Sequence, residues 1–466
     1  MPPLWRRVGV AATALRRNGA ARRETVSARR EARTPESALP AGPRPHVSSS
    51  ANLSSASAFR SLRNPNYRLW ATGAFISNIG TWMQRTAQDW LVLAELTPHS
   101  GTAVGIVMAL QFGPSLALLP FTGLAADVFD RRKLLLVTQS TMGVLALGLG
   151  LLTVFGAVEL WHVYAFAFLL GCTTAFDAPA RQTFVSELVG TADLSNAVAL
   201  NSTSFQAARM IGPAIAGVVI AGFGSGWAFL ANAASFAAMI FALARLRIVD
   251  RDRHERAAPA RGGIAEGWRY VRARPDQQVV LAMLFLISAF GLNFAIFIAT
   301  MAVSVFHVGA HRYGLLTSLL AIGSVAGALL AARRERPQMS VLLAGAGVFG
   351  VGCAAAAVMP DYWLFGAMLV VIGAASQTFM TTANGTIQLG TDPPMRGRVM
   401  AIYLAIALGS TPLGAPIVGW VADVAGARWA LAVGAAAGLG AALVGVLYRR
   451  RLAVLHTAHS QDRQLQ

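Results

Sequence analysis

Three ionisable residues lie inside long apolar runs of the sequence. Arg85 and Asp89 fall within the run 69–94, and Arg209 falls within the run 195–222. A charged group at membrane depth costs a few kcal/mol, so it marks a functional site by default. We predict that these groups line a central cavity, where the arginines bind an anionic group and Asp89 carries a proton. The alternative is a self-neutralising Arg85–Asp89 pair at the outer interface, with Arg209 reaching towards the membrane surface.

Helical rise places the two arginines at a similar depth. Counted at 1.5 Å per residue, Arg85 lies about 24 Å from the inner surface if its helix enters near Leu69, and Arg209 lies about 22 Å in if its helix enters near Leu194. Burial favours the neutral acid at Asp89, and a nearby arginine favours the carboxylate. We therefore predict that Asp89 lies near an arginine in one transport state and is released in the other.

Amide side chains on other apolar runs complete the candidate substrate set: Gln111, Asn293 and Gln377. Aromatic residues in the same runs would make the cavity amphipathic: Trp82, Phe205, Phe290 and Phe379. Such a lining suits a drug-like or aromatic ligand. The sequence has no P-loop, no paired Cys/His spacing and no Ser-His-Asp candidate. We expect no enzyme activity, no cofactor and no metal site.

These residues belong to a chain with the composition of a membrane protein. The chain has 466 residues, of which 55% are hydrophobic and 13% are charged. A soluble domain carries about 25% charged residues. Twelve apolar runs are long enough to cross a bilayer as helices. The runs are 69–94, 102–126, 134–156, 158–178, 195–222, 226–246, 278–305, 313–332, 339–359, 362–385, 398–422 and 428–448.

The basic residues alternate between the loops. The net charge is +18, which in a soluble protein would indicate nucleic acid. Here the bases gather in every second loop: Arg131, Arg132, Lys133, Arg181, the segment 245–274, Arg333, Arg334, Arg336, Arg396, Arg398 and Arg449 to Arg451. This is the positive-inside pattern. It predicts a multi-pass protein of the plasma (inner) membrane with both termini cytoplasmic, and no nucleic-acid partner.

The sequence predicts five regions. An Arg-rich extension (1–58) precedes an N-terminal six-helix half (59–246), a linker (247–277), a C-terminal six-helix half (278–448) and a cytoplasmic tail (449–466). The extension has three interpretations: a disordered cytoplasmic tail, a start codon placed too far upstream, or a targeting segment. The linker contains an amphipathic pattern that predicts a short helix on the inner membrane surface. We expect a monomer.

A charged hinge joins the second and third runs. Gly123 and Asp127 end one helix, Asp130 precedes the next, and Arg131 and Arg132 follow. A carboxylate at a helix start is stabilised by the helix dipole, so Asp130 should mark the start of the third helix. Asp127 and Arg131 are candidates for a gate. A turn with a positive cytoplasmic flank is the simpler alternative.

Small residues on the fifth run indicate close helix packing. Gly212, Pro213 and Gly217 allow tight contact and a bend, although ordinary small-residue packing would need the same residues. The segment from Gly212 to Gly217 is echoed at Gly414 to Gly419. This internal repeat is consistent with two halves related by duplication.

The sequence resembles a family of transporters. The hinge pattern G-x-x-x-D-x-x-x-R-R from Gly123 resembles the loop 2–3 signature of the major facilitator superfamily, although Val128 and Asp130 depart from it. Four segments resemble the transmembrane secretion effector, or enterobactin exporter-like, branch: Ile76–Val92, Asp177–Gln182, Asn196–Ser202 and Glu266–Val271. The fifth run also resembles, in degenerate form, the antiporter signature of drug:proton exporters.

The resemblance implies an all-α fold of twelve transmembrane helices in two six-helix halves. It also implies a secondary active transporter that works by alternating access. The expected activity is proton-coupled export of a small amphipathic molecule, such as a drug, siderophore or secondary metabolite. Two alternatives remain: an importer or facilitator on the same scaffold, and a non-transporting membrane sensor or scaffold.

Overall fold

The computed structural model describes residues 59–118, 121–122, 129–246, 264–334 and 337–464. Side chains at 191–192, 264, 332 and 452–464 are outside this description. The predictions for the extension 1–58, and for Gly123 and Asp127 of the hinge, also lie outside the described residues. The residues from Ser57 onward form one compact unit. Every regular element in the described part is helical, which confirms the predicted all-α class.

The N-terminal half consists of the elements before the linker: η2 (Arg60–Arg63), α2 (Pro65–Trp90), η3 (Leu91–Leu96), α3 (Gly101–Ala117), α5 (Arg131–Val154), α6 (Leu160–Leu188), α7 (Thr191–Phe223) and α8 (Ser225–Arg245). The linker helix is α9 (Ile264–Arg272). The C-terminal half consists of α10 (Pro275–Leu286), η4 (Ile287–Gly291), α11 (Phe294–Thr300), η5 (Met301–Val305), α12 (Ala310–Ala332), α13 (Met339–Val358), α14 (Tyr362–Leu389), α15 (Arg396–Gly409), α16 (Thr411–Ala425) and α17 (Ala427–Gln464).

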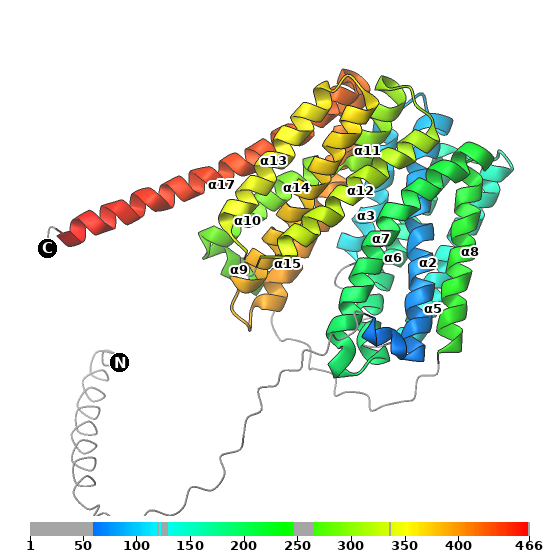
Figure 1. The fold of residues 1–466 in the computed structure, drawn as a ribbon, viewed down its shortest axis with the longest axis horizontal. Helices are drawn as coiled ribbons and strands as arrows, with labels where there is room; N and C mark the ends of the chain where they lie inside the picture. Colours follow the sequence, from blue (N-terminus) through cyan, green and yellow to red (C-terminus); the bar gives the residue numbers. More distant parts are fainter. Residues whose placement is uncertain (1–58, 119–120, 123–128, 247–263, 335–336, 465–466) are drawn as a thin grey trace, which may run out of the picture. The chain divides into compact units, whose positions relative to one another are not determined.

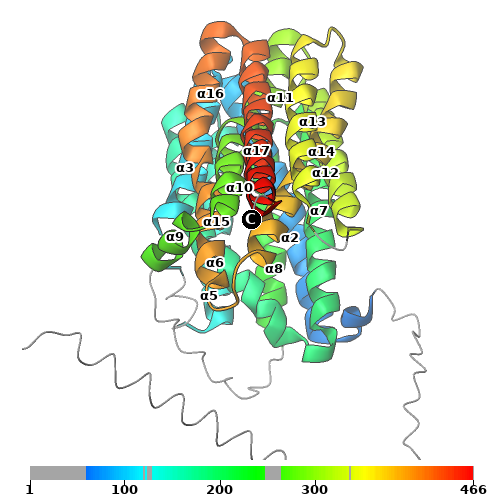
Figure 2. The ribbon, with the colours of Figure 1, turned by 90° about the vertical axis from the view of Figure 1, so that its left-hand side faces the viewer.

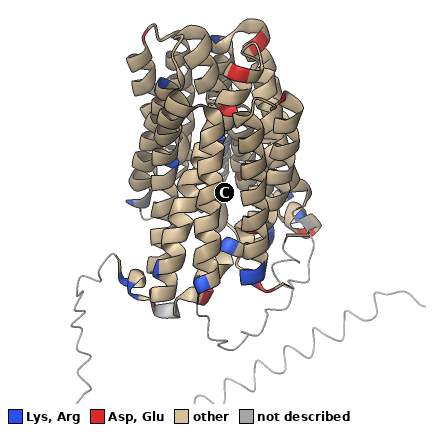
Figure 3. Cartoon of the chain, turned by 90° about the vertical axis from the view of Figure 1, so that its right-hand side faces the viewer, with Lys and Arg blue, Asp and Glu red and all other residues tan. Residues whose placement is uncertain are grey.

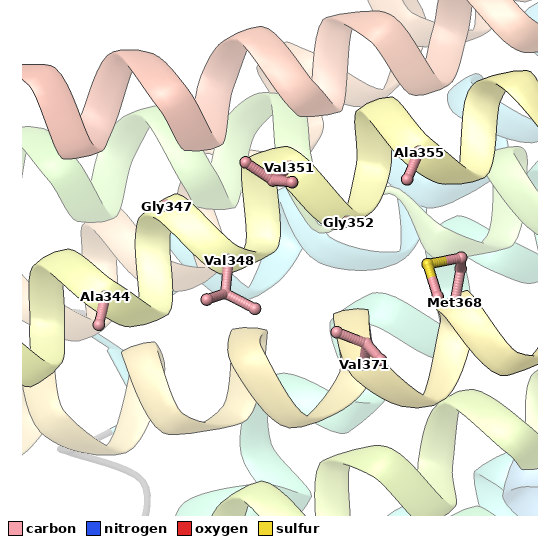
Figure 4. Close-up of a pocket in the computed structure, with 8 residues that line it drawn as sticks. All are labelled: Ala344, Gly347, Val348, Val351, Gly352, Ala355, Met368 and Val371. Carbon is pink, nitrogen blue, oxygen red and sulfur yellow. The ribbon is translucent and has the colours of Figure 1, made fainter.

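Most of these helices have the length and composition of membrane spans. Among the described residues, ten helical segments are long and apolar enough to cross a bilayer, and α3 is a shorter apolar helix. Large apolar side chains also face outward: Val137 is 64% exposed and Val351 is 60% exposed. Val351 belongs to a shallow surface depression between α13 and α14, lined only by apolar residues and glycine (Figure 4). Such a surface is stable in lipid rather than in water.

Helix starts follow the capping residues in the sequence. Asp130 is the N-cap of α5 and accepts a hydrogen bond from the Lys133 backbone N–H at 2.9 Å, as predicted from its position. Asp361 caps α14 in the same way and accepts from Trp363 and Leu364. These carboxylates satisfy backbone donors that have no partner within the helix.

The seventh predicted span is a broken helix. The segment from α10 to η5 contains two π-helical turns, η4 and η5, and loses helical geometry at Leu292 and Asn293. The side-chain amide of Asn293 donates to the Ala289 carbonyl at 2.7 Å. Its Oδ1 is buried and has no hydrogen-bond partner. π-Helical turns and broken membrane helices are often found at functional sites.

The two ends of the helices differ in charge. Figure 3 shows most of the lysine and arginine positions towards one end of the helices. We call this the basic end; it includes Arg131, Arg132 and Lys133 at the start of α5. The opposite end, called the base-poor end, contains the turns at Gly156, Gly224 and Gly426, which all have positive φ.

The two halves pack against each other through two helix pairs. Figure 2 shows α3 beside α16, and Figure 1 shows α12 beside α7. In the second pair, the Ser318 hydroxyl donates to the Met210 carbonyl at 2.9 Å. A Cβ atom on Gly314 would lie 2.4 Å from the Pro213 carbonyl oxygen. Only glycine allows the two backbones to approach this closely.

The linker helix α9 is held against the C-terminal half. Glu266 pairs with Arg398 at 3.0 Å, and Arg274 pairs with Asp392 at 3.0 Å. Val271 is 2% exposed and packs into the core of that half. A helix therefore forms where the sequence predicts an amphipathic one; on its apolar side Val271 contacts protein, whereas Trp268 is 44% exposed.

Candidate functional site

The two membrane-depth arginines lie on one aromatic ring. The Arg85 guanidinium carbon is 5.1 Å from the centre of the Trp82 ring, and that of Arg209 is 5.4 Å away. Arg85 is also 5.6 Å from the Phe112 ring on α3. Phe205 packs edge-on against Trp82 at 5.8 Å. Helices α2, α3 and α7 thus bring two cations and three aromatic rings together, and we call these five residues the arginine–tryptophan cluster.

The arginines of this cluster form no ion pair with any carboxylate that the structure describes. In the described part of the chain, the five ion pairs within 4 Å are Arg60–Asp193, Arg131–Glu187, Arg181–Asp177, Arg274–Asp392 and Arg398–Glu266. The Arg85 Nε atom is buried and has no hydrogen-bond partner. A buried cation stacked on aromatic rings is partly stabilised, but its N–H donors remain available. The cluster is therefore suited to an anionic group.

Asp89 lies near a side chain of the C-terminal half as well as near its neighbour on the helix. Its carboxylate is close enough to the hydroxyl of Tyr313 on α12 for an electrostatic interaction. The Tyr313 ring is 1% exposed and stacks on Trp90, with ring centres 5.7 Å apart. Arg85 is close enough for an electrostatic interaction with Asp89, without an ion pair. The predicted carboxylate thus lies at a contact between the two halves.

The small residues of α7 position this cluster. A Cβ atom on Gly212 would lie 2.6 Å from the Trp82 Cβ atom, and one on Gly217 would lie 2.9 Å from the Ala310 carbonyl oxygen. Pro213 lies within the helix between these two contacts. The predicted packing residues therefore place α7 against α2 on one side and against α12 on the other.

The predicted amide residues take different positions. Gln111 is half-buried on α3, next to Phe112 of the cluster. Gln377 is half-buried on α14, and its amide donates to Thr381 at 3.3 Å. Asn293 is fully buried at the break of the seventh span. Of the three, only Gln111 is on an element that contributes to the arginine–tryptophan cluster.

The described hinge residues make contacts within the N-terminal half. Arg131 forms an ion pair with Glu187 at the end of α6, at 2.5 Å. Arg132 donates to the carbonyls of Leu243 and Ala244 at the end of α8, both at 2.9 Å. These bonds satisfy orphan carbonyls at a helix C-terminus.

Two groups of residues were missed by the sequence reasoning. Tyr313 is the first residue of the predicted run 313–332, and no role was predicted for it from the sequence. Phe112 was hidden among other apolar residues. Both residues act through a contact with another helix. The spacing of residues along one helix does not reveal such a contact.

The second missed group is a buried polar cluster around Asp177. The Asp177 carboxylate accepts from Thr138 and Gln139, both at 2.8 Å, and pairs with Arg181 at 3.1 Å. Arg181 also donates to Asn78 at 3.5 Å. The i, i+4 spacing of acid and base was a usable signal, but the predicted apolar run ended beside Asp177. This network joins α2, α5 and α6.

The fold and the charged interior define a membrane transport protein built from two helical halves. Residues 56–464 match the family described as transmembrane secretion effector, of the major facilitator superfamily type. The chain therefore belongs to this family of secondary transporters, and it is not an enzyme.

Curated relatives are transporters. The chain is 26% identical to the staphyloferrin A transporter of Staphylococcus aureus, with 76% of this chain and 89% of the relative aligned. It is 25% identical to the multidrug efflux pump Tap of Mycolicibacterium fortuitum (76% and 88%). It is 24% identical to the enterobactin exporter EntS of Escherichia coli (82% and 91%).

Solved structures with the same fold are also transporters. A bacterial homologue of the human lysosomal transporter Spinster, in an inward-facing and unoccupied conformation, gives a TM-score of 0.65 at 15% identity, with 82% of this chain and 95% of that chain covered. The nucleoside transporter NupG gives a TM-score of 0.66 at 12% identity (82% and 98%). These similarities confirm the predicted superfamily fold.

Proposed function

We propose that the protein is a proton-coupled exporter, an antiporter that moves a small amphipathic molecule out of the cell by alternating access. The observation that carries this proposal is the pairing of two functions on one helix. Helix α2 contributes Arg85 and Trp82 to a site for an anionic, aromatic ligand, and one turn away it contributes Asp89 to a contact between the halves. Substrate binding and proton binding can then influence each other through a single element.

The arginine–tryptophan cluster supports a substrate with both an aromatic part and an acidic group. The rings of Trp82, Phe112 and Phe205 offer apolar and stacking surface, and Phe205 is 44% exposed. Two guanidinium groups that form no ion pair with a described carboxylate can provide charge-assisted hydrogen bonds to oxygen anions. The relatives are named for siderophores and drugs, and we propose that the substrate comes from this wider group of small molecules or from other secondary metabolites.

The contact of Asp89 with Tyr313 supports the coupling role. Alternating access requires the contacts between the halves to break and re-form. When α12 moves away from α2, Asp89 loses its interaction with Tyr313 and its environment changes. A carboxylate whose environment differs between two states takes up a proton in one state and releases it in the other. When the binding site is empty, the positive charges of Arg85 and Arg209 favour release of the proton from Asp89.

The charge distribution supports an orientation with the basic end in the cytoplasm. In this orientation both termini are cytoplasmic, and the contacts between α3 and α16 close the outer side. Closure of the outer side is what we expect of a state that receives substrate from the cell. The described hinge residues Arg131 and Arg132 lie on the cytoplasmic side, where we propose that they act with Asp127 as a gate.

The test is a transport assay in cells of a strain that lacks its own siderophore exporters. Cells with and without the protein are loaded with enterobactin, staphyloferrin A or a cationic dye, and the retained amount is measured with and without a protonophore. The proposal predicts lower retention with the protein, and loss of the difference when the protonophore is present. Higher retention in cells with the protein would identify an importer instead. Equal retention for all three probes would count against any of these substrates.

A further inference from the structure

A carboxylate of one half caps a helix of the other half at the base-poor end. Asp423, near the end of α16, accepts hydrogen bonds from the backbone N–H of Gly101 at 2.5 Å and of Thr102 at 3.0 Å. It also accepts from the Ser100 hydroxyl at 2.9 Å. Residues 101 and 102 begin α3, so their N–H groups have no partner within the helix. The cap of α3 is therefore partly supplied by the opposite half of the protein.

The backbones meet closely at the same place. A Cβ atom on Gly419 would lie 2.2 Å from the Gly101 carbonyl oxygen, and one on Gly105 would lie 2.5 Å from the Ala415 carbonyl oxygen. Glycine on both helices lets α3 and α16 touch over more than one turn. The side chain of Asp423 is exposed. It therefore stabilises the contact through directional, charge-assisted hydrogen bonds rather than through burial of apolar surface.

We propose that Asp423 is a positioning residue that holds the base-poor end closed. We call Ser100, Gly101, Thr102 and Asp423 the end latch. When the halves separate at this end, α3 loses these acceptors and keeps only the Ser100 side chain, which accepts from the Ala103 N–H at 3.2 Å. Opening must therefore break charge-assisted bonds to a helix N-terminus, where a carboxylate is also favoured by the helix dipole. The proposal rests on alternating access as proposed above, but not on substrate, direction or proton coupling.

The test measures the opening of each end in the purified protein. Cys172 and Cys353 are first replaced by alanine. Spin labels are then attached to cysteines at Phe155 and Val358, which are exposed and lie at the base-poor ends of α5 and α13 in different halves. Electron–electron distance distributions are recorded in lipid nanodiscs without substrate. A second pair at Lys133 and Gln388 reports on the basic end.

Asp423→Ala is expected to add a longer distance at the base-poor end and to raise the ratio of open to closed protein about tenfold, which corresponds to about 1.4 kcal/mol. The basic-end pair should shift to shorter distances in the same sample. Asp423→Glu keeps the carboxylate and should restore most of the closed population. Asp423→Asn keeps a hydrogen-bond acceptor but loses the charge, so its effect should be intermediate. If Asp423→Ala cannot be purified in folded form, the measurement is made on Asp423→Asn.

Asp361→Ala is the matched control. Asp361 also caps a helix at the base-poor end, but the helix is its own, α14. Its removal should leave the distance distributions unchanged. Unchanged distributions in Asp423→Ala, or an equal effect of Asp361→Ala, would overturn the proposal. These outcomes need neither substrate nor a pH gradient, so failure of the latch is distinguishable from failure of the proposed export function.

Discussion

Removal of the Arg209 side chain should weaken the binding of anionic substrates without lowering the stability of the fold. Arg209→Ala takes away one of the two guanidinium groups that lie on Trp82 and leaves the other, Arg85, in place. A hydrogen bond to a charged group contributes about 1.5–3 kcal/mol, and each 1.4 kcal/mol changes affinity tenfold. We expect anionic ligands to bind about ten- to a hundredfold more weakly. A cationic dye should lose less than about threefold, because it gains nothing from a guanidinium.

Folding should not suffer from the same change. The two arginines repel each other, and Arg209 forms none of the ion pairs between described residues. The midpoint of thermal unfolding in detergent should therefore stay within a few degrees of the wild type. Arg209→Lys keeps the charge but loses the planar fork, so anion affinity should recover only in part.

The assay is equilibrium binding of enterobactin, staphyloferrin A and a cationic dye to purified protein. Arg312→Ala is the matched control, since Arg312 also lies over an aromatic ring, 5.7 Å from the centre of Tyr362, but outside the cluster. Its removal should change none of the three affinities. An equal loss for anions and cations in Arg209→Ala, or an equal loss of anion affinity in Arg312→Ala, would refute the reasoning.

Three further predictions concern the gate, the buried network and the orientation. Asp127→Asn should reach the membrane at normal levels but transport poorly; normal transport would leave the hinge as a turn only. Asp177→Ala should lower the free energy of unfolding by about 3 kcal/mol, because it leaves the half-buried Arg181 without its acid and the buried Gln139 amide without its acceptor; a thermal midpoint equal to the wild type would contradict this. A cysteine at Pro98 in a cysteine-free background should react with an impermeant thiol reagent added to cells, and one at Gln338 should not; the reverse pattern would invert the orientation.

The fold was largely predictable because membrane helices are specified by local sequence. Each needs about 20 apolar residues, and caps such as Asp130 mark the first residue of a helix. The first span was predicted from the apolar run 69–94. Helix α2 in that run is not among the ten strongly apolar segments, because it contains polar residues such as Arg85 and Asp89. The break at Asn293 was not predicted, because no proline marks it and the surrounding residues are uniformly apolar.

The site was only partly predictable. Equal depth along two helices placed Arg85 and Arg209 at one level, but depth alone does not show which faces meet. The shared contact with Trp82 depends on the packing of α7 against α2. The role of Asp423 was not predicted for a related reason. This residue lies just beyond the predicted run 398–422, and its contacts are with a helix more than 300 residues away.

The central claim is that Asp89 couples proton movement to transport. The most direct measurement uses the wild type and Asp89→Asn reconstituted in liposomes that contain a pH-sensitive dye, with enterobactin added outside. The account predicts that substrate movement drives proton movement in the opposite direction in the wild type. Asp89→Asn should still exchange substrate down its gradient, but without a change in internal pH. A normal proton signal in Asp89→Asn, or substrate transport without proton movement in the wild type, would contradict the account.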